Sequence, residues 1–325
     1  MQARREPRIT THRNAERVCQ NPDCGRLFVP GEGSYGKFCD LQCAAAYKAM
    51  LSTGEGIVRI IEPVAPDLVD RTVFDGPKIL TADWHLPNLH ARMWERLLEV
   101  RKATGISELV IAGDWMDNRA FSPHPGDHGI SHLPAHELAT TVMDELCKRF
   151  KRVILAPGNH DWWLAEFFKG TLEYDDIIRI LFQKFIDAGV LRIVPVPYVH
   201  MSDCGEEFVI VHQKTFSGVN PQGVAVGLES NRLEYRDKHV ITTHGHLEAI
   251  GRSGPGHRLA GQLGCMTDPK RTNYIQKYTT RHREWNPGFG VVSNGWFWTV
   301  NNIMGDGAVK AVCRAAKPNR IKAEV

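Results

Sequence analysis

The sequence of 325 residues predicts an α/β protein, and three observations support that expectation. Short runs of β-branched and aliphatic residues alternate with longer segments in which apolar residues recur at helical spacing. Hydrophobic residues make up 42% of the chain, enough to bury a sizeable core. Polar residues directly follow five of the apolar runs. A sheet covered by helices accounts for all three observations.

The expected strands are the apolar runs that open five segments: PKILTADWH, ELVIAGDWMD, RVILAPGNHD, EFVIVHQ and HVITTHGH. The expected helices lie between them and are marked by three sets of apolar residues at helical spacing: Met93, Trp94, Leu97 and Leu98; Leu138, Val142, Leu146 and Phe150; Ile178, Leu181 and Phe185. In sheets of this kind, ligands collect at the carboxyl ends of the strands, where the polar residues fall.

A small cysteine module is expected over residues 19–51, after a basic tail of residues 1–18. Four of the eight cysteines form two close pairs there: Cys19 with Cys24, and Cys39 with Cys43. Paired thiolates suit a structural zinc ion, at about 2.3 Å from each sulfur. Zinc would supply the folding free energy that so small a module lacks. The module resembles a treble-clef zinc finger, and the alternative is four reduced cysteines in an unstructured leader.

The remaining boundaries follow from composition. Residues 52–76 contain Pro and Gly without a sustained period and are expected to be a linker. The large domain is expected over 77–303, and a basic tail over 304–325. No apolar stretch approaches the ~18 residues that cross a bilayer, so we expect no membrane contact and a cytoplasmic location. The net charge of +3 does not indicate a polyelectrolyte partner for the whole chain.

Five consecutive strand ends supply metal-ligand types. These residues are Asp83, His85, Asp114, Asn159, His160, His212, His244 and His246. Taken singly, each has an ordinary alternative as a turn residue, a helix cap or a buried core histidine. Together they offer oxygen and nitrogen donors without a thiolate, which borderline divalent metals accept. Manganese is the first expectation, with iron or zinc as alternatives.

The motif order Asp-x-His, Gly-Asp-x-x-Asp, Gly-Asn-His-Asp, His and His-x-His resembles the calcineurin-like metallophosphoesterase superfamily, in particular its phage and bacterial members. The resemblance implies a two-layered β-sandwich flanked by helices, with two metal ions at the sheet edge. It implies that Asp83, His85 and His246 hold one ion, that Asn159, His212 and His244 hold the other, and that Asp114 bridges them. It assigns no metal to His160, which would protonate the leaving group, with Asp117 as its orienting partner.

Two departures from the superfamily pattern stand out. The family usually has Gly-His-x-His where this chain has Thr243 to His246, and a shifted register would make Glu248 a ligand. We prefer His244 and His246, because the preceding strand then ends in the usual register. Asn118 also separates Arg119 from the second Asp of its motif, which weakens a phosphate-clamping role for Arg119.

The expected function is therefore a dinuclear phosphoesterase that attacks phosphodiester bonds with a metal-activated hydroxide. Seven Lys and Arg against one Asp between residues 252 and 283, together with the cysteine module, favour DNA, RNA or nucleotides as substrate. Arg119 and Trp162 are the candidate substrate contacts. The alternatives are a phosphomonoesterase or protein phosphatase, and a zinc-finger binding protein with an inactive phosphoesterase domain. The sequence indicates no oligomeric state.

Overall fold

The computed structural model describes residues 17–21, 24, 26–29, 37–53, 72–123, 132–168, 171–213, 223, 225–228, 235, 237–252, 258–272 and 285–319. The chain divides into two compact units, Met1–Asp67 and Leu68–Val325. Most of the expected basic N-terminal tail and linker lies outside the described residues, as does much of the basic stretch between 252 and 283. Within the described residues, none of the helices combines the length and hydropathy that a bilayer crossing requires.

The first unit is a hairpin followed by a helix. Strand β1 (Arg17–Val18) pairs antiparallel with β2 (Leu27–Phe28), and helix α1 spans Leu41–Thr53. The backbone N–H of Cys43 donates to Asp40 Oδ1 at 2.8 Å, so Asp40 caps the start of α1. The second cysteine pair therefore spans a helix start.

The second unit contains two six-stranded sheets. In spatial order, the first sheet is β14 (Trp296–Asn301), β13 (Gly288–Ser293), β4 (Lys78–Thr81), β5 (Glu108–Ala112), β6 (Arg152–Ala156) and β7 (Leu191–Ile193). The second is β11 (Ala249–Arg252), β12 (Leu259–Gln262), β10 (His239–Thr242), β9 (Glu206–Val211), β8 (Tyr198–Asp203) and β3 (Val73–Asp75). Strands β4 to β7 are mutually parallel, as are β9, β10 and β12.

The central strands of the first sheet, β13, β4, β5 and β6, are largely apolar on both faces because both faces are buried. Along β5, Leu109 and Ile111 belong to the core beneath the helices, whereas Val110 belongs to the core that also holds Phe208 and Ile210 of β9. The second core therefore lies between the two sheets, and its thickness is filled by alternate residues of each strand. This arrangement explains the continuous apolar runs in the sequence.

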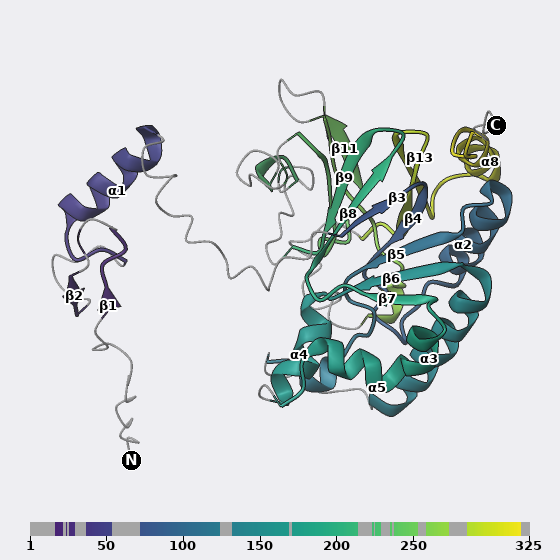
Figure 1. Cartoon of the computed structure of the whole chain (residues 1–325), viewed down its shortest axis with the longest axis horizontal. Coiled ribbons are helices and arrows are strands. Elements are labelled where there is room, and N and C mark those ends of the chain that lie inside the picture. The colour runs from purple at the N-terminus through teal and green to yellow at the C-terminus, as the bar shows by residue number, and fades with distance from the viewer. Residues whose placement is uncertain are drawn as a thin grey trace, which may run out of the picture. The chain divides into compact units, whose positions relative to one another are not determined.

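Helices cover the outer face of the first sheet. They are α2 (Ala91–Thr104), α3 (His132–Arg149), α5 (Tyr174–Asp187) and α8 (Asp306–Ala315), and the shorter α4 spans Asn159–Phe167. Figure 1 shows α2, α3 and α5 along this face, where Met93, Leu146 and Phe182 join one buried cluster. The expected α/β sandwich flanked by helices is confirmed.

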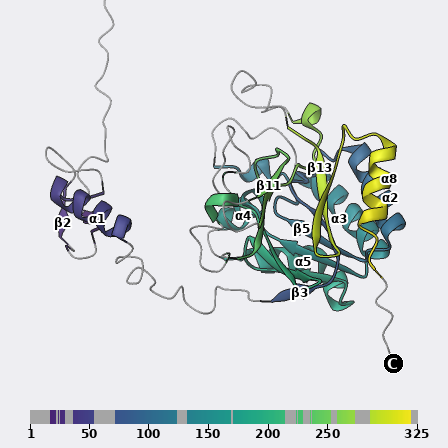
Figure 2. The same cartoon turned by 90° about the horizontal axis from the view of Figure 1, so that it is seen from above.

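Two segments extend the large unit beyond the expected boundaries. Strand β3 lies within the expected linker, and α8 lies within the expected basic tail. Val309 and Cys313 are buried in the same core as α2, beside which α8 lies in Figures 1 and 2. Val309, Val312, Cys313 and Ala316 have the spacing of an amphipathic helix. The basic residues between them dominate the composition of this segment, so composition alone suggests a tail.

Candidate metal centre

The expected ligands converge at one edge of the sandwich. Asp83 and His85 follow β4, Asp114 follows β5, and Asn159 follows β6 at the first position of α4. His212 follows β9, and His244 and His246 follow β10. All of these strands present their carboxyl ends to the same place, so residues more than 160 positions apart become neighbours.

The first group consists of Asp83, His85 and His246, which are all buried. His246 Nε2 lies 3.1 Å from Asp83 Oδ1 and 3.1 Å from His85 Nε2. Donor atoms this close, from the loops after β4 and β10, are the arrangement that a single ion accepts. The ring of Trp285 packs edge-on against His246, with 3.7 Å between ring centroids, and closes one side of the group.

The second group surrounds His212. Its Nε2 lies 3.1 Å from Asn159 Oδ1, and its ring centroid lies 5.2 Å from that of His244. One donor atom each from Asp83, Asp114, His212 and His244 lies within 4.8 Å of the others. His212 Nδ1 approaches the carbonyl of Ala112 at 3.1 Å and therefore carries the proton, which leaves Nε2 able to bind a metal.

Asp114 lies between the two groups. Its Oδ2 is 3.6 Å from His85 Nε2 and 3.4 Å from His212 Nε2, and it is buried without a hydrogen-bond partner among the described residues. Its Oδ1 accepts the backbone N–H of His160 at 2.9 Å. A buried carboxylate oxygen without a donor is costly unless a cation completes it. The residues present therefore fit a pair of bridged divalent ions.

Backbone geometry sets these residues apart from ordinary loop residues. Asp83, His85, Asp114, His244 and His246 all have positive φ, between 43° and 75°. This left-handed region is unfavourable for residues with a side chain, and such strain concentrates at functional sites. The chain adopts it five times within one centre, where it turns each side chain back toward the shared space.

Electrostatics within the centre are strongly coupled. Burial alone opposes ionisation of Asp114, but the neighbouring His212 and His160 hold its pKa well below the ordinary value. Burial likewise opposes charge on His212, yet the Asp114 carboxylate raises the pKa of His212 to about 9. Burial and the nearby His212 lower the pKa of His244 to about 4. A metal that binds here therefore competes with a proton on His212.

His160 and Asp117 stand beside the metal groups. His160 Nδ1 lies 2.6 Å from the carbonyl oxygen of Asp117 and 3.3 Å from its Oδ1. Because a carbonyl only accepts, Nδ1 carries the proton, and Nε2 is the nitrogen left for a substrate. Burial raises the pKa of Asp117, but contacts with His160 and His85 outweigh burial and lower it to about 2. Asn88 Nδ2 donates to the other Asp117 oxygen at 3.4 Å.

Two glycines make room for the carboxylate and the imidazole. A Cβ on Gly158 would collide with Asp114 Oδ1 and with the Asp114 backbone nitrogen, and one on Gly113 would collide with the ring of His212. Gly158 has φ of −111°, which any residue adopts, so the need at this position is space. Gly113, with φ of 89°, combines both reasons.

Asp161 braces the turn before α4. Its Oδ2 accepts the backbone N–H of Gly158 at 2.9 Å, and its two oxygens face the backbone N–H groups of Trp115 and Met116 at 3.4 Å. It thus combines a helix cap with a link to the loop after β5. Burial and the charge of Asp114 raise its pKa to about 6.

The tryptophans of the motifs are placed unequally. Trp84 and Trp115 are fully buried in the core, where large aromatic rings contribute most to packing. Trp162, our candidate substrate contact, packs against the same core, whereas the ring of Trp163 lies 3.9 Å from that of His160. The other candidate, Arg119, is half-buried in the short helix η2 (Arg119–Phe121).

The register of the last motif agrees with the preferred one. Glu248 accepts from Asn301 Nδ2 at 2.8 Å and is not among the clustered donor groups, which include both His244 and His246. Thr243, which motif reasoning passed over, places its hydroxyl 2.9 Å from His212 Nδ1. A threonine at the end of the strand VITT was the only signal for that contact.

The four cysteines of the first unit also form a cluster. Cys39 Sγ lies 3.5 Å from Cys43 Sγ and 3.7 Å from Cys24 Sγ. The sulfur atoms of all four cysteines lie within 4.8 Å of one another. Thiolates about 2.3 Å from a tetrahedral zinc stand roughly 3.8 Å apart. The sulfur positions therefore fit one ion.

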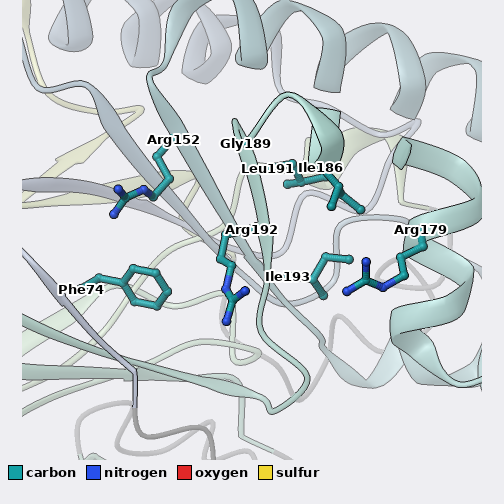
Figure 3. Close-up of a pocket in the computed structure, with 8 residues that line it drawn as sticks. All are labelled: Phe74, Arg152, Arg179, Ile186, Gly189, Leu191, Arg192 and Ile193. Atoms are coloured by element: carbon teal, nitrogen blue, oxygen red, sulfur yellow. The ribbon is translucent and has the colours of Figure 1, made fainter. Parts of the chain in front are cut away.

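A separate cavity of about 280 Å³ lies away from this centre, at the β7 edge of the sandwich (Figure 3). It is lined by Phe74, Arg152, Arg179, Ile186, Gly189, Leu191, Arg192 and Ile193. None of the clustered metal-ligand residues contributes to it. Arg152 and Arg179 pair with Glu108 and Asp175, at 3.3 Å and 2.9 Å. The cavity is not the place where the sequence motifs meet.

Solved structures similar to this chain include Yfce, a phosphoesterase from E. coli (15% identity, TM-score 0.34, covering 67% of this chain and 88% of that one). Others are a single mutant of Vps29 from Entamoeba histolytica (12%, 0.36, 70% and 99%) and vacuolar protein sorting 29 from Cryptosporidium parvum (14%, 0.37, 70% and 96%). No curated protein matches the sequence significantly.

The family model for calcineurin-like phosphoesterases matches residues 77–260, which is more than half of the chain and contains every residue of the two metal groups. On that match, this chain belongs to the calcineurin-like phosphoesterase family.

Proposed function

We propose that this protein hydrolyses phosphodiester bonds, in nucleic acid or nucleotides, with two divalent metal ions. Asp83, His85 and His246 hold one ion, Asn159, His212 and His244 hold the other, and Asp114 bridges them. The observation that carries the proposal is the unpartnered Asp114 Oδ2, at 3.4 Å and 3.6 Å from a histidine nitrogen of each group. The mixed set of His, Asp and Asn ligands suits manganese, iron and zinc, and manganese is the first metal to test.

The bound metals supply a water of lowered pKa and neutralise the phosphoryl oxygens. The chain supplies the leaving-group proton. His160 Nδ1 is tied to Asp117, so the ring presents Nε2 to the ester oxygen that departs. As the imidazolium, His160 would donate its Nε2 proton to that oxygen, while the Asp117 carboxylate, 3.3 Å from Nδ1, holds the ring in the orientation needed for the transfer. Asn88 donates a hydrogen bond to the Asp117 carboxylate, and Asn118 donates one to the backbone carbonyl of His160, so both residues of the pair are held in place.

The two remaining parts of the proposal concern metal and substrate. Cys19, Cys24, Cys39 and Cys43 hold one structural zinc ion, which the sulfur spacing supports. Arg119 is kept as a candidate phosphate contact beside the centre, and Trp163 replaces Trp162 as the aromatic nearer to His160. The narrower resemblance to phage and bacterial members stays a prediction.

The test uses the full chain, stripped by chelation and reloaded with manganese, iron or zinc. Hydrolysis of bis-p-nitrophenyl phosphate is compared with that of p-nitrophenyl phosphate, and a higher rate on the diester supports the proposal. Faster hydrolysis of the monoester would instead favour a phosphomonoesterase. Fully loaded protein that hydrolyses neither ester, nor DNA, RNA or cyclic nucleotides, would contradict the proposal and favour an inactive binding domain.

His160 is tested by leaving-group dependence. His160→Ala should lower kcat by roughly 10²- to 10⁴-fold on a substrate with an alkoxide leaving group. The loss should be smaller on bis-p-nitrophenyl phosphate, because p-nitrophenolate departs without a proton. Equal losses on both substrates, at full metal content, would remove the general-acid role.

A further inference from the structure

Helix α4 carries a row of aromatic rings that starts at His160. Trp163 and Phe167 lie three and seven residues further on, which places all three on one face of the helix. The Trp163 ring lies 3.9 Å from that of His160, at an interplanar angle of 34°. Phe121 of η2 packs against Phe167 with 4.9 Å between centroids, and Phe168 follows at 5.7 Å.

The outer part of this row faces solvent. Phe167 is 59% exposed and Phe168 is 38% exposed, although large aromatic rings contribute most to stability when buried. The row is continuous with the candidate centre through the contact between Trp163 and His160. It rises along α4 for about 10 Å, the length of two or three stacked nucleotides at about 3.4 Å each.

We infer that this aromatic strip, formed by Trp163, Phe167, Phe168 and Phe121, stacks the bases of a single-stranded nucleic acid whose phosphodiester lies at the metal centre. The inference rests on the proposed function and specifies its substrate class. Flat rings beside a phosphoester site match a ligand in which each phosphate is followed by a flat base. In a duplex the bases are already stacked on each other and are not open to side chains from the backbone side.

Charge near the strip favours bases over phosphates as the groups in contact. Glu166 is exposed and immediately precedes Phe167, so its carboxylate repels phosphates from the outer end. Arg119 supplies a cation in the same turn as Phe121, closer in sequence to the Asp114 loop. Phosphates are therefore favoured toward the metal centre, while stacking holds the bases along α4.

The experiment measures kinetics on three substrates with the manganese-loaded full chain: a short single-stranded oligodeoxynucleotide, its duplex and bis-p-nitrophenyl phosphate. Phe167→Ala should raise KM for the single strand by roughly five- to tenfold, from the loss of one stacked base. The factor by which KM rises should be at least about five times larger for the single strand than for bis-p-nitrophenyl phosphate. Phe167→Trp should return KM for the single strand toward the wild-type value. Ile180→Ala, which removes a side chain 67% exposed on α5, is the matched control and should change nothing.

Each outcome decides between the two proposals. Unchanged KM for the single strand in Phe167→Ala, or equal losses on all substrates, overturns the base-stacking role. A wild-type protein that hydrolyses bis-p-nitrophenyl phosphate but neither binds nor cleaves oligonucleotides also overturns it, while leaving the metal-dependent phosphodiesterase intact. If the wild type hydrolyses nothing, but fluorescence anisotropy shows oligonucleotide binding that Phe167→Ala weakens, the proposed function fails and the strip stands.

Discussion

Replacing Gly158 by alanine tests whether close packing holds the bridging carboxylate in place. The added Cβ would meet both Asp114 Oδ1 and the Asp114 backbone nitrogen, so rotating the side chain alone cannot relieve the collision. Forced packing costs about 1–3 kcal/mol, and moving Asp114 also loses the hydrogen bond from the His160 N–H, worth about 1.5–3 kcal/mol. Since displacing Asp114 relieves the forced packing at the expense of the hydrogen bond, only one of the two costs applies, and we expect the free energy of unfolding to fall by about 1–3 kcal/mol.

Metal content is the more specific measurement for Gly158→Ala. Displaced Asp114 no longer faces both histidine groups, so the ions measured by plasma mass spectrometry after gel filtration should fall below the wild-type content. Gly307→Ala is the control: an added Cβ on this residue of α8 meets no atom within 4 Å, and its stability should be unchanged or higher. A Gly158→Ala protein with full metal content and wild-type stability would refute the reasoning.

Three further outcomes follow from the described contacts. Asp114→Asn should lose metal and at least about 10²-fold in rate, because a neutral amide cannot bridge two cations, whereas the same change at half-exposed Asp144 on α3 should leave metal content unchanged. Cys39→Ser should lower zinc, measured by colorimetric release, by one equivalent, and Cys204→Ser should not, because exposed Cys204 lies outside the cluster. Lys78→Met should destabilise the protein by about 1–3 kcal/mol without changing metal content, since the buried Lys78 Nζ donates to the carbonyls of Asp75 and Gly76 at 2.6 and 2.9 Å. Burial lowers the pKa of Lys78 despite the nearby Glu108, so the unfolded chain binds more protons as pH approaches 10.5; the resulting rise in stability with pH should be missing in Lys78→Met.

The positions of the expected metal ligands stand out in the sequence because each follows a strand whose last residues are buried on both faces. A run such as LVIA cannot continue into Asp114 without ending the strand, so the polar residue marks the sheet edge. Their convergence follows from parallel strands sharing one edge, which the alternation of strands and helices already indicates. The cysteine cluster was predictable for a different reason, since spacing alone brings close pairs together.

Other features depend on contacts that spacing does not encode. Trp162 and Trp163 are equivalent in the sequence, and only the rotation of α4 decides which ring packs on the core and which on His160. Asn88 reaches Asp117 across 29 positions through a loop with no recognisable motif. The need for a glycine at position 158 is also hidden in the sequence, because it comes from close contact with Asp114, which is remote along the chain.

The two oxygens of Asp114 face different neighbours, one toward the space between the histidine groups and one toward the amide that opens α4. The affinity of the centre for cations and the position of the His160 backbone are therefore thermodynamically linked, and such linkage acts in both directions. Under the proposed function, a change that loosens the first turn of α4 lowers the binding free energy of the ions, and loss of the ions destabilises that turn by the same amount. Substitutions in that turn at positions other than Asn159 replace no proposed ligand, yet they belong among the determinants of metal occupancy.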